Sequence, residues 1–214
     1  MTAVRPLTQV SLLRGVAELA GRDPLLAGIV EQFGPPPLWG RPRGFPTLVR
    51  IILEQQVSLG SAAALFARLQ QAVGPAVRPV DVRRLGPEGL QSLGFTRQKA
   101  RYVAGLADIL VAEEISLARI ARLPDIAARD ALVAIPGIGP WTAGVYLLMA
   151  LRRPDIWPPG DLGLHKSMAE LHGMPAIPTS AEASAIAQRW QPWRSVAARL
   201  LWHSYLSRRH RGSH

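Results

Sequence analysis

The chain has 214 residues, with 25 Lys and Arg against 15 Asp and Glu, and a formal net charge of +10. This length suits one or two compact domains, and a hydrophobic fraction of 48% excludes an intrinsically disordered chain. The chain contains no cysteine, which excludes disulfides, thiolate zinc sites, iron–sulfur clusters and cysteine nucleophiles.

Helical periodicity runs along the whole chain, and no segment of any length alternates as a strand does. The first helices are expected from Leu12 to Leu19 and from Asp23 to Val30, and a connector rich in Gly and Pro follows from Gly34 to Pro46. Further helices are expected at 47–57, 61–74, 96–109, 125–135, 140–151, from 162, from 179, and at 192–206. The sequence therefore predicts an all-α protein.

The positive charge is carried almost entirely by arginine, because Lys99 and Lys166 are the only lysines. A basic protein of this kind most often binds a polyanion, and nucleic acid is the leading candidate. An arginine-rich composition can also reflect a GC-rich coding bias. Charges interrupt every apolar stretch before the roughly 20 residues needed to span a bilayer. The N-terminus does not have the pattern of a signal peptide. We expect a cytoplasmic protein, associated with the nucleoid if bacterial, that has no membrane partner.

The most informative segment is 132–143, which contains Ile135-Pro136-Gly137-Ile138-Gly139. Gly137 and Gly139 permit a turn that a side chain would obstruct, and Ile138 would anchor the turn in the core. The helix after the turn would present unpaired N–H groups to a phosphate. An ordinary αα-hairpin uses Gly and Pro for the same steric reasons and is the alternative.

This segment resembles the helix-hairpin-helix of the endonuclease III superfamily of DNA glycosylases. The surrounding residues most resemble its 3-methyladenine DNA glycosylase II branch. Four further segments match in chain order, at 52–58, 94–100, 159–162 and 191–195. The resemblance covers about residues 40–206 and implies an all-α, two-lobed fold with a cleft for DNA and the base between the lobes. It implies N-terminal helices at 1–45 packed on the C-terminal lobe, a helical-barrel lobe at 46–150, a C-terminal lobe at 151–206 and a basic tail at 207–214.

The resemblance implies that Asp161 is the catalytic aspartate, carried by the C-terminal lobe. Cleavage of an N-glycosidic bond develops positive charge on the sugar, and a fixed carboxylate stabilises that charge and orients water. Asp is also a favoured N-cap, so Asp161 is equally suited to begin a helix at Leu162. Both roles are compatible.

The subtype depends on Trp141. In bifunctional relatives the corresponding residue is a lysine, whose amine forms a Schiff base with the sugar. The tryptophan here predicts that water is the nucleophile, that strands stay intact and that the product is an abasic site.

The expected base pocket contains Trp141, Trp202 and Tyr146. Trp202 matches a base-stacking tryptophan of the family, and tryptophan is the best aromatic face for a cationic alkylated purine. Core packing is the alternative for both tryptophans. The pocket tyrosines of the best-known members are replaced here by Val145 and Leu162.

The same resemblance places Gln56 at the wedge that fills the gap left by a flipped nucleotide. The neighbouring Gln55 is expected to satisfy backbone groups at a helix end, and Glu54 to be solvated. Phosphate contacts are expected from Gly137, Gly139, Thr142, Lys99 and Arg194.

No histidine set has metal-ligand spacing, so no metal site made of side chains is expected. A structural monovalent cation on the hairpin carbonyls is implied only by the family. On this resemblance we expect a monomeric, monofunctional glycosylase for alkylated purines in damaged duplex DNA. The alternatives are a glycosylase of the same fold for an oxidised or mismatched base, and a non-catalytic DNA-binding module.

Overall fold

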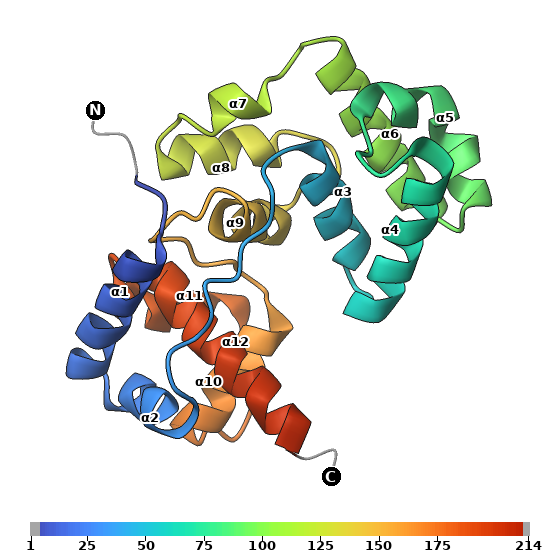
Figure 1. Cartoon of the computed structure of the whole chain (residues 1–214). Coiled ribbons are helices and arrows are strands. Elements are labelled where there is room, and N and C mark those ends of the chain that lie inside the picture. The colour runs from blue at the N-terminus through green and yellow to red at the C-terminus, as the bar shows by residue number, and fades with distance from the viewer. Residues whose placement is uncertain (1–4, 212–214) are drawn as a thin grey trace. The chain divides into compact units, whose positions relative to one another are not determined.

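The computed structural model describes residues 5–211, and every regular element within this range is a helix (Figure 1). This confirms the all-α prediction. The elements are α1 Gln9–Arg22, α2 Pro24–Phe33, α3 Phe45–Glu54, α4 Leu59–Val73, α5 Pro79–Ser92, α6 Arg97–Val111, α7 Leu117–Ile120, α8 Asp125–Val133, α9 Pro140–Met149, α10 Leu162–His172, α11 Ser180–Ala187, the short 3₁₀ helix Gln188–Trp190, and α12 Arg194–Arg211. None of these helices is long and apolar enough to cross a membrane.

The chain forms two compact units, and within the described residues it passes from one to the other between Gly40 and Arg41 and, inside α9, between Tyr146 and Leu147. Within the described residues, the first unit spans 41–146, where the sequence predicted a lobe at 46–150. The second unit combines 5–40 with 147–211.

The first unit is organised around α3, which carries an apolar face that is fully buried. Leu48, Ile51 and Ile52 on this face have no exposed surface. α3 packs against α4 and α6, and α5 lies along α6 (Figure 1). The end of α3 is thereby held rigidly, and the turn that follows it carries Gln55 and Gln56.

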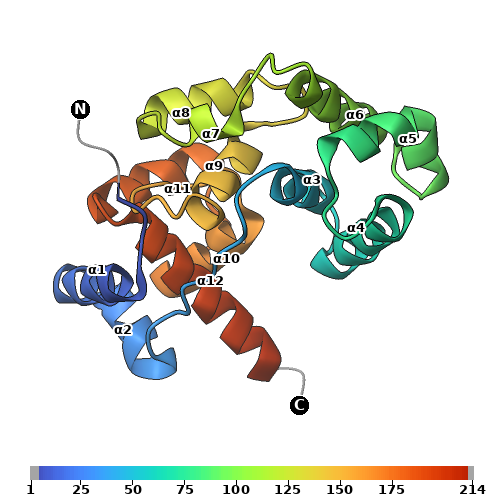
Figure 2. The ribbon, with the colours of Figure 1, turned by 45° about the horizontal axis from the view of Figure 1, so that its top comes forward.

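The second unit is organised around α12, which packs against α10, α2 and α1 (Figure 2). Arg199 of α12 is fully buried, and its guanidinium donates to the carbonyl oxygens of Ser195, Trp39 and Leu148 at 3.0–3.1 Å. Burial lowers the pKa of Arg199 to about 10. The buried cation ties the connector before α3 and the end of α9 to the central helix of this unit.

The last helix is longer than the sequence predicted. It was expected to end near Leu206, but α12 continues to Arg211. Arg208 pairs with Glu170 of α10 at 3.4 Å, and the guanidinium of Arg209 lies over the Tyr205 ring. These contacts stabilise the final turns, so residues 207–211 of the expected tail are helical. Residues 1–4 of the predicted N-terminal segment and 212–214 of the tail lie outside the described range.

Candidate functional site

The predicted hairpin is present as α8, a short turn and α9. Ile135 and Ile138 are buried, so the turn is anchored in the core as expected. Gly137 has φ 89°, and a Cβ there would lie 2.4 Å from Cγ of Tyr102. Only glycine fits this position, because both the backbone conformation and the neighbouring ring exclude a side chain.

Gly139 differs from Gly137, and here the steric expectation is wrong. A Cβ at Gly139 would meet nothing within 4 Å, and its φ lies outside the left-handed region. The protein therefore leaves open space beside Gly139, directly before the first turn of α9.

Gln55 connects the turn after α3 to the hairpin. Its side-chain Nε2 donates to the carbonyl oxygen of Gly137 and to Oγ1 of Thr142, both at 2.9 Å. This confirms that Gln55 satisfies backbone at a helix end. Thr142 is only 1% exposed, so its hydroxyl faces the interior. The phosphate contact predicted for Thr142 would therefore use its backbone N–H and not its hydroxyl.

Lys99 has a role that the sequence did not predict, at the end of α3. Its Nζ donates to the carbonyl oxygens of Leu53 and Gln55, both at 2.8 Å, at the C-terminal end of α3. A cation is favourable at this end of a helix, and burial lowers the pKa of Lys99. Lys99 therefore caps α3, and a phosphate would compete with two carbonyls for its ammonium group.

Glu54 is not the solvated residue that was expected. Its carboxylate accepts a hydrogen bond from Arg41 at 2.8 Å, and its side chain is 9% exposed. The ion pair holds the segment before α3, which contains Arg41, against the last turn of α3. No local pattern in the sequence indicates this pair, because its partners are in different elements.

Gln56 is exposed and has φ 57°, a left-handed conformation that is costly for a residue other than glycine. Val57 and Leu59 beside it are 47% and 65% exposed. Sequence reasoning missed this apolar flank, although two aliphatic residues in a turn are a visible signal. A groove of about 550 Å³ is lined by Gln56, Tyr102 and hairpin residues 133–139.

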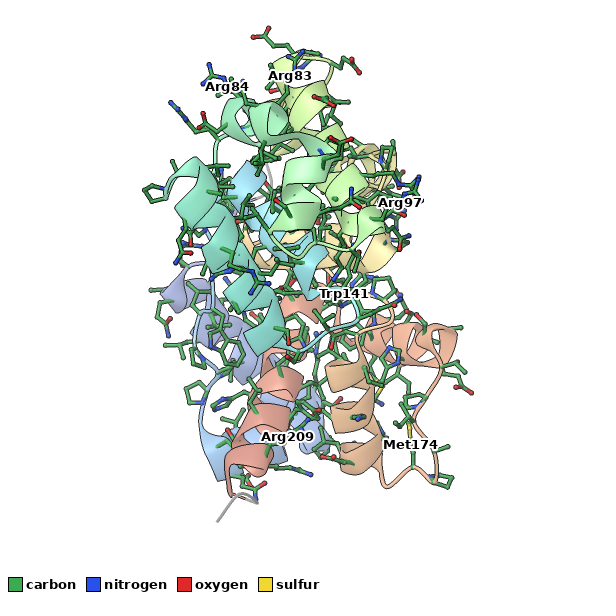
Figure 3. All side chains as sticks on the ribbon, turned by 90° about the vertical axis from the view of Figure 1, so that its right-hand side faces the viewer. Arg83, Arg84, Arg97, Trp141, Met174 and Arg209 are labelled. Atoms are coloured by element: carbon green, nitrogen blue, oxygen red, sulfur yellow. The ribbon has the colours of Figure 1, made fainter. Side chains whose placement is uncertain are left out.

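The predicted base-pocket residues of the first unit divide into two kinds. Trp141 is half-buried in the first turn of α9 (Figure 3). Tyr146 is 1% exposed, and its hydroxyl accepts a hydrogen bond from the backbone N–H of Gly44 at 3.0 Å. Burial also raises the pKa of Tyr146. Tyr146 is thus a core residue, and the pocket role expected for it is not supported.

The second unit brings Asp161 and Trp202 together. Asp161 is the N-cap of α10, and its Oδ1 accepts hydrogen bonds from the backbone N–H of Leu164 and from Nε1 of Trp202, both at 3.0 Å. The helix-capping alternative is therefore correct for Asp161. It does not conflict with the catalytic prediction, because the donors from Leu164 and Trp202 together hold the carboxylate in one direction.

The loop that leads to Asp161 is held by the start of α12. The guanidinium of Arg194 donates to both carboxylate oxygens of Asp155 at 2.9 Å. Oγ of Ser195 accepts from the N–H of Ile156 and donates to its carbonyl oxygen. Arg194 thus clamps this loop, and the phosphate contact expected from it stays a prediction. Sequence reasoning missed Asp155 and Ser195, although the 191–195 match contained the signal.

His165 lies one turn after Asp161 in α10 and is buried. Burial lowers its pKa, and the nearby Asp161 charge opposes that shift only in part. No group of three or more His, Asp or Glu residues within residues 5–211 is placed to hold a metal ion.

Comparisons with known proteins place this chain in one family. The family model of the HhH-GPD superfamily of base excision DNA repair proteins matches residues 49–192. A DNA-3-methyladenine glycosylase of Bacillus subtilis is 32% identical over 86% of this chain, which spans 65% of that protein's length.

Two solved structures have the same fold. One is the 3-methyladenine DNA glycosylase of Schizosaccharomyces pombe in complex with abasic DNA, with a TM-score of 0.76, 25% identity, and coverage of 88% of this chain and 95% of that one. The other is the DNA-3-methyladenine glycosidase of Bacillus halodurans, with a TM-score of 0.78, 26% identity, and coverage of 96% and 94%. The chain belongs to the HhH-GPD superfamily of base excision DNA repair proteins.

Proposed function

We propose that this protein is a monofunctional DNA glycosylase that removes alkylated purines, such as 3-methyladenine and 7-methylguanine, from duplex DNA. The observation that carries the proposal is the Asp161 carboxylate, fixed at the N-terminus of α10 by Leu164 and Trp202. The named relatives of similar sequence and structure support the same substrate class.

The reaction needs only one well-placed anion. As the bond between sugar and base breaks, the departing purine takes the electron pair and the sugar becomes positively charged. Asp161 stabilises that charge and orients a water molecule, whose oxygen forms the new bond to the anomeric carbon while one of its protons passes to the Asp161 carboxylate. An alkylated purine is already a good leaving group because its ring is positively charged. The product is an abasic site.

Strand cleavage by a lysine Schiff base is not expected. Position 141, where bifunctional relatives carry lysine, is tryptophan. Lys99 is engaged with the carbonyl oxygens at the end of α3, which leaves its amine unsuited to attack a sugar.

DNA contact is proposed through the hairpin and the turn after α3. The open space beside Gly139 suits a phosphate oxygen against the first N–H groups of α9. The exposed, left-handed Gln56 suits a wedge at a flipped nucleotide. A monovalent cation on the carbonyl oxygens of the hairpin turn would add positive charge for the phosphate. We propose that a monomer acts in this way.

The test is base release from methylated duplex DNA, with Asp161→Asn beside the wild type. The wild type is expected to release 3-methyladenine or 7-methylguanine, leave strands intact until they are heated in alkali, and lose this activity in Asp161→Asn. Release confined to a duplex with an oxidised or mismatched base would assign a different lesion. Equal salt-sensitive DNA binding by both proteins without release of any base would assign a binding module.

A further inference from the structure

We propose that Trp202 is a positioning residue, whose indole N–H holds the Asp161 carboxylate in its working direction. This deepens the proposed function and rests on it. A base-stacking role would use the face of the indole ring, whereas the contact in this structure uses the N–H at its edge.

Leu164 and Trp202, which both donate to Oδ1 of Asp161, belong to different helices. Leu164 belongs to α10, the helix that Asp161 caps, and Trp202 belongs to α12. A single N-cap hydrogen bond leaves the carboxylate free to rotate about its own side-chain bonds. A second donor on the same oxygen, carried by a neighbouring packed helix, removes that freedom.

Gly163 supports the same arrangement. A Cβ at Gly163 would lie 3.2 Å from Oδ1 of Asp161 and 3.7 Å from both Cδ1 of Trp202 and Cδ1 of Tyr205. The φ of Gly163 is not in the left-handed region, so the backbone there would accept alanine. Gly163 thus leaves room for the Asp161 carboxylate to accept the hydrogen bond from Trp202.

The same unit contains a matched pair for comparison. Nε1 of Trp193 donates to Oε2 of Glu18 at 2.6 Å, so Trp193 makes the same kind of indole–carboxylate bond. This pair joins α1 to the residue before α12, and its acceptor is Glu18. Trp193→Phe therefore removes the same chemical group without touching Asp161.

The experiment measures the single-turnover rate of 7-methylguanine release and the dissociation constant for the lesion duplex. The proteins are the wild type, Trp202→Phe, Gly163→Ala and Trp193→Phe, with thermal unfolding of each. Phenylalanine keeps an aromatic face at position 202 and loses only the N–H donor.

We expect Trp202→Phe to lower the rate by about tenfold, equivalent to about 1.4 kcal/mol, with the dissociation constant within about threefold of wild type. Gly163→Ala should lower the rate in the same way, because its Cβ displaces the carboxylate while Trp202 is unchanged. Trp193→Phe should match the wild type.

A Trp202→Phe variant with the wild-type rate of base release would overturn the inference. A variant whose only defect is weaker binding of the lesion duplex would also overturn it, because that result assigns Trp202 to contact with the base. If Trp202→Phe does not fold, Gly163→Ala decides, because a folded variant with the wild-type rate contradicts the positioning role. If the wild-type protein releases no methylated purine, the proposed function itself is contradicted. If Trp202→Phe and Gly163→Ala both keep the wild-type rate, only the positioning role is contradicted.

Discussion

The side-chain amide of Gln55 donates to the carbonyl oxygen of Gly137 at 2.9 Å and so joins the turn after α3 to the hairpin turn. The backbone carbonyl of Gln55 in turn accepts from Lys99. One residue therefore ties together the two segments of the first unit that are proposed to contact DNA. The strained conformation of Gln56 is held by this network on its N-terminal side.

Removing the amide of Gln55 should loosen this unit. Gln55→Met leaves the Gly137 carbonyl and the buried Thr142 hydroxyl without a donor, so the free energy of unfolding should fall by about 1–3 kcal/mol. Urea denaturation measures this. Gln70→Met is the control, since Gln70 donates to Pro75 on the surface and should change stability by less than about 0.5 kcal/mol. Equal losses in both variants would contradict the network.

The two hairpin glycines should separate stability from DNA binding. Gly137→Ala places a Cβ against Tyr102 in a left-handed backbone and should cost about 2–4 kcal/mol of stability. Gly139→Ala meets no protein atom within 4 Å and should keep the unfolding midpoint of wild type. It should nevertheless weaken binding to undamaged duplex, because its methyl group enters the proposed phosphate space. If Gly139→Ala binds undamaged duplex as tightly as the wild type, the space beside Gly139 is not part of the DNA interface.

Arg194 offers a test between clamping a loop and contacting phosphate. Arg194→Met should lower base release, because Asp155 and the loop before Asp161 lose their partner. The slope of log affinity against log salt should stay at the wild-type value, whereas loss of a phosphate contact reduces that slope by about 1. Asp155→Asn should reproduce the effect of Arg194→Met on base release. A reduced slope in Arg194→Met would restore the phosphate role that the sequence predicted.

Stability should fall as the solution becomes mildly acidic. Burial lowers the pKa of His165, and burial together with Arg189 lowers that of His172, both from a usual value of 6.5. Below that value the unfolded chain binds protons that the folded chain does not, so the free energy of unfolding decreases as pH falls toward the folded pKa values. Urea denaturation between pH 8 and pH 5 should show this decrease, and His165→Gln should reduce its size. A flat profile would contradict the lowered pKa values of these two imidazoles.

Local signals in the sequence were sufficient for most of the helices, though not for α5 and α7, and for the hairpin and the residue that begins α10. Capping residues, proline at first turns and the apolar spacing act within a few residues of one another, so the chain displays them without its fold. Ile138 was expected in the core for this reason, and Asp161 was expected at a helix start. Both expectations agree with the structure.

Side-chain partners were decided only by the tertiary structure. Lys99 and Arg194 look like phosphate-binding cations in the sequence, but each finds an internal acceptor, on the end of α3 and on Asp155 respectively. Tyr146 finds the N–H of Gly44, a hundred residues earlier in the chain. Long polar side chains reach whatever acceptor the packing of helices brings near, and that acceptor leaves no trace beside them in the sequence.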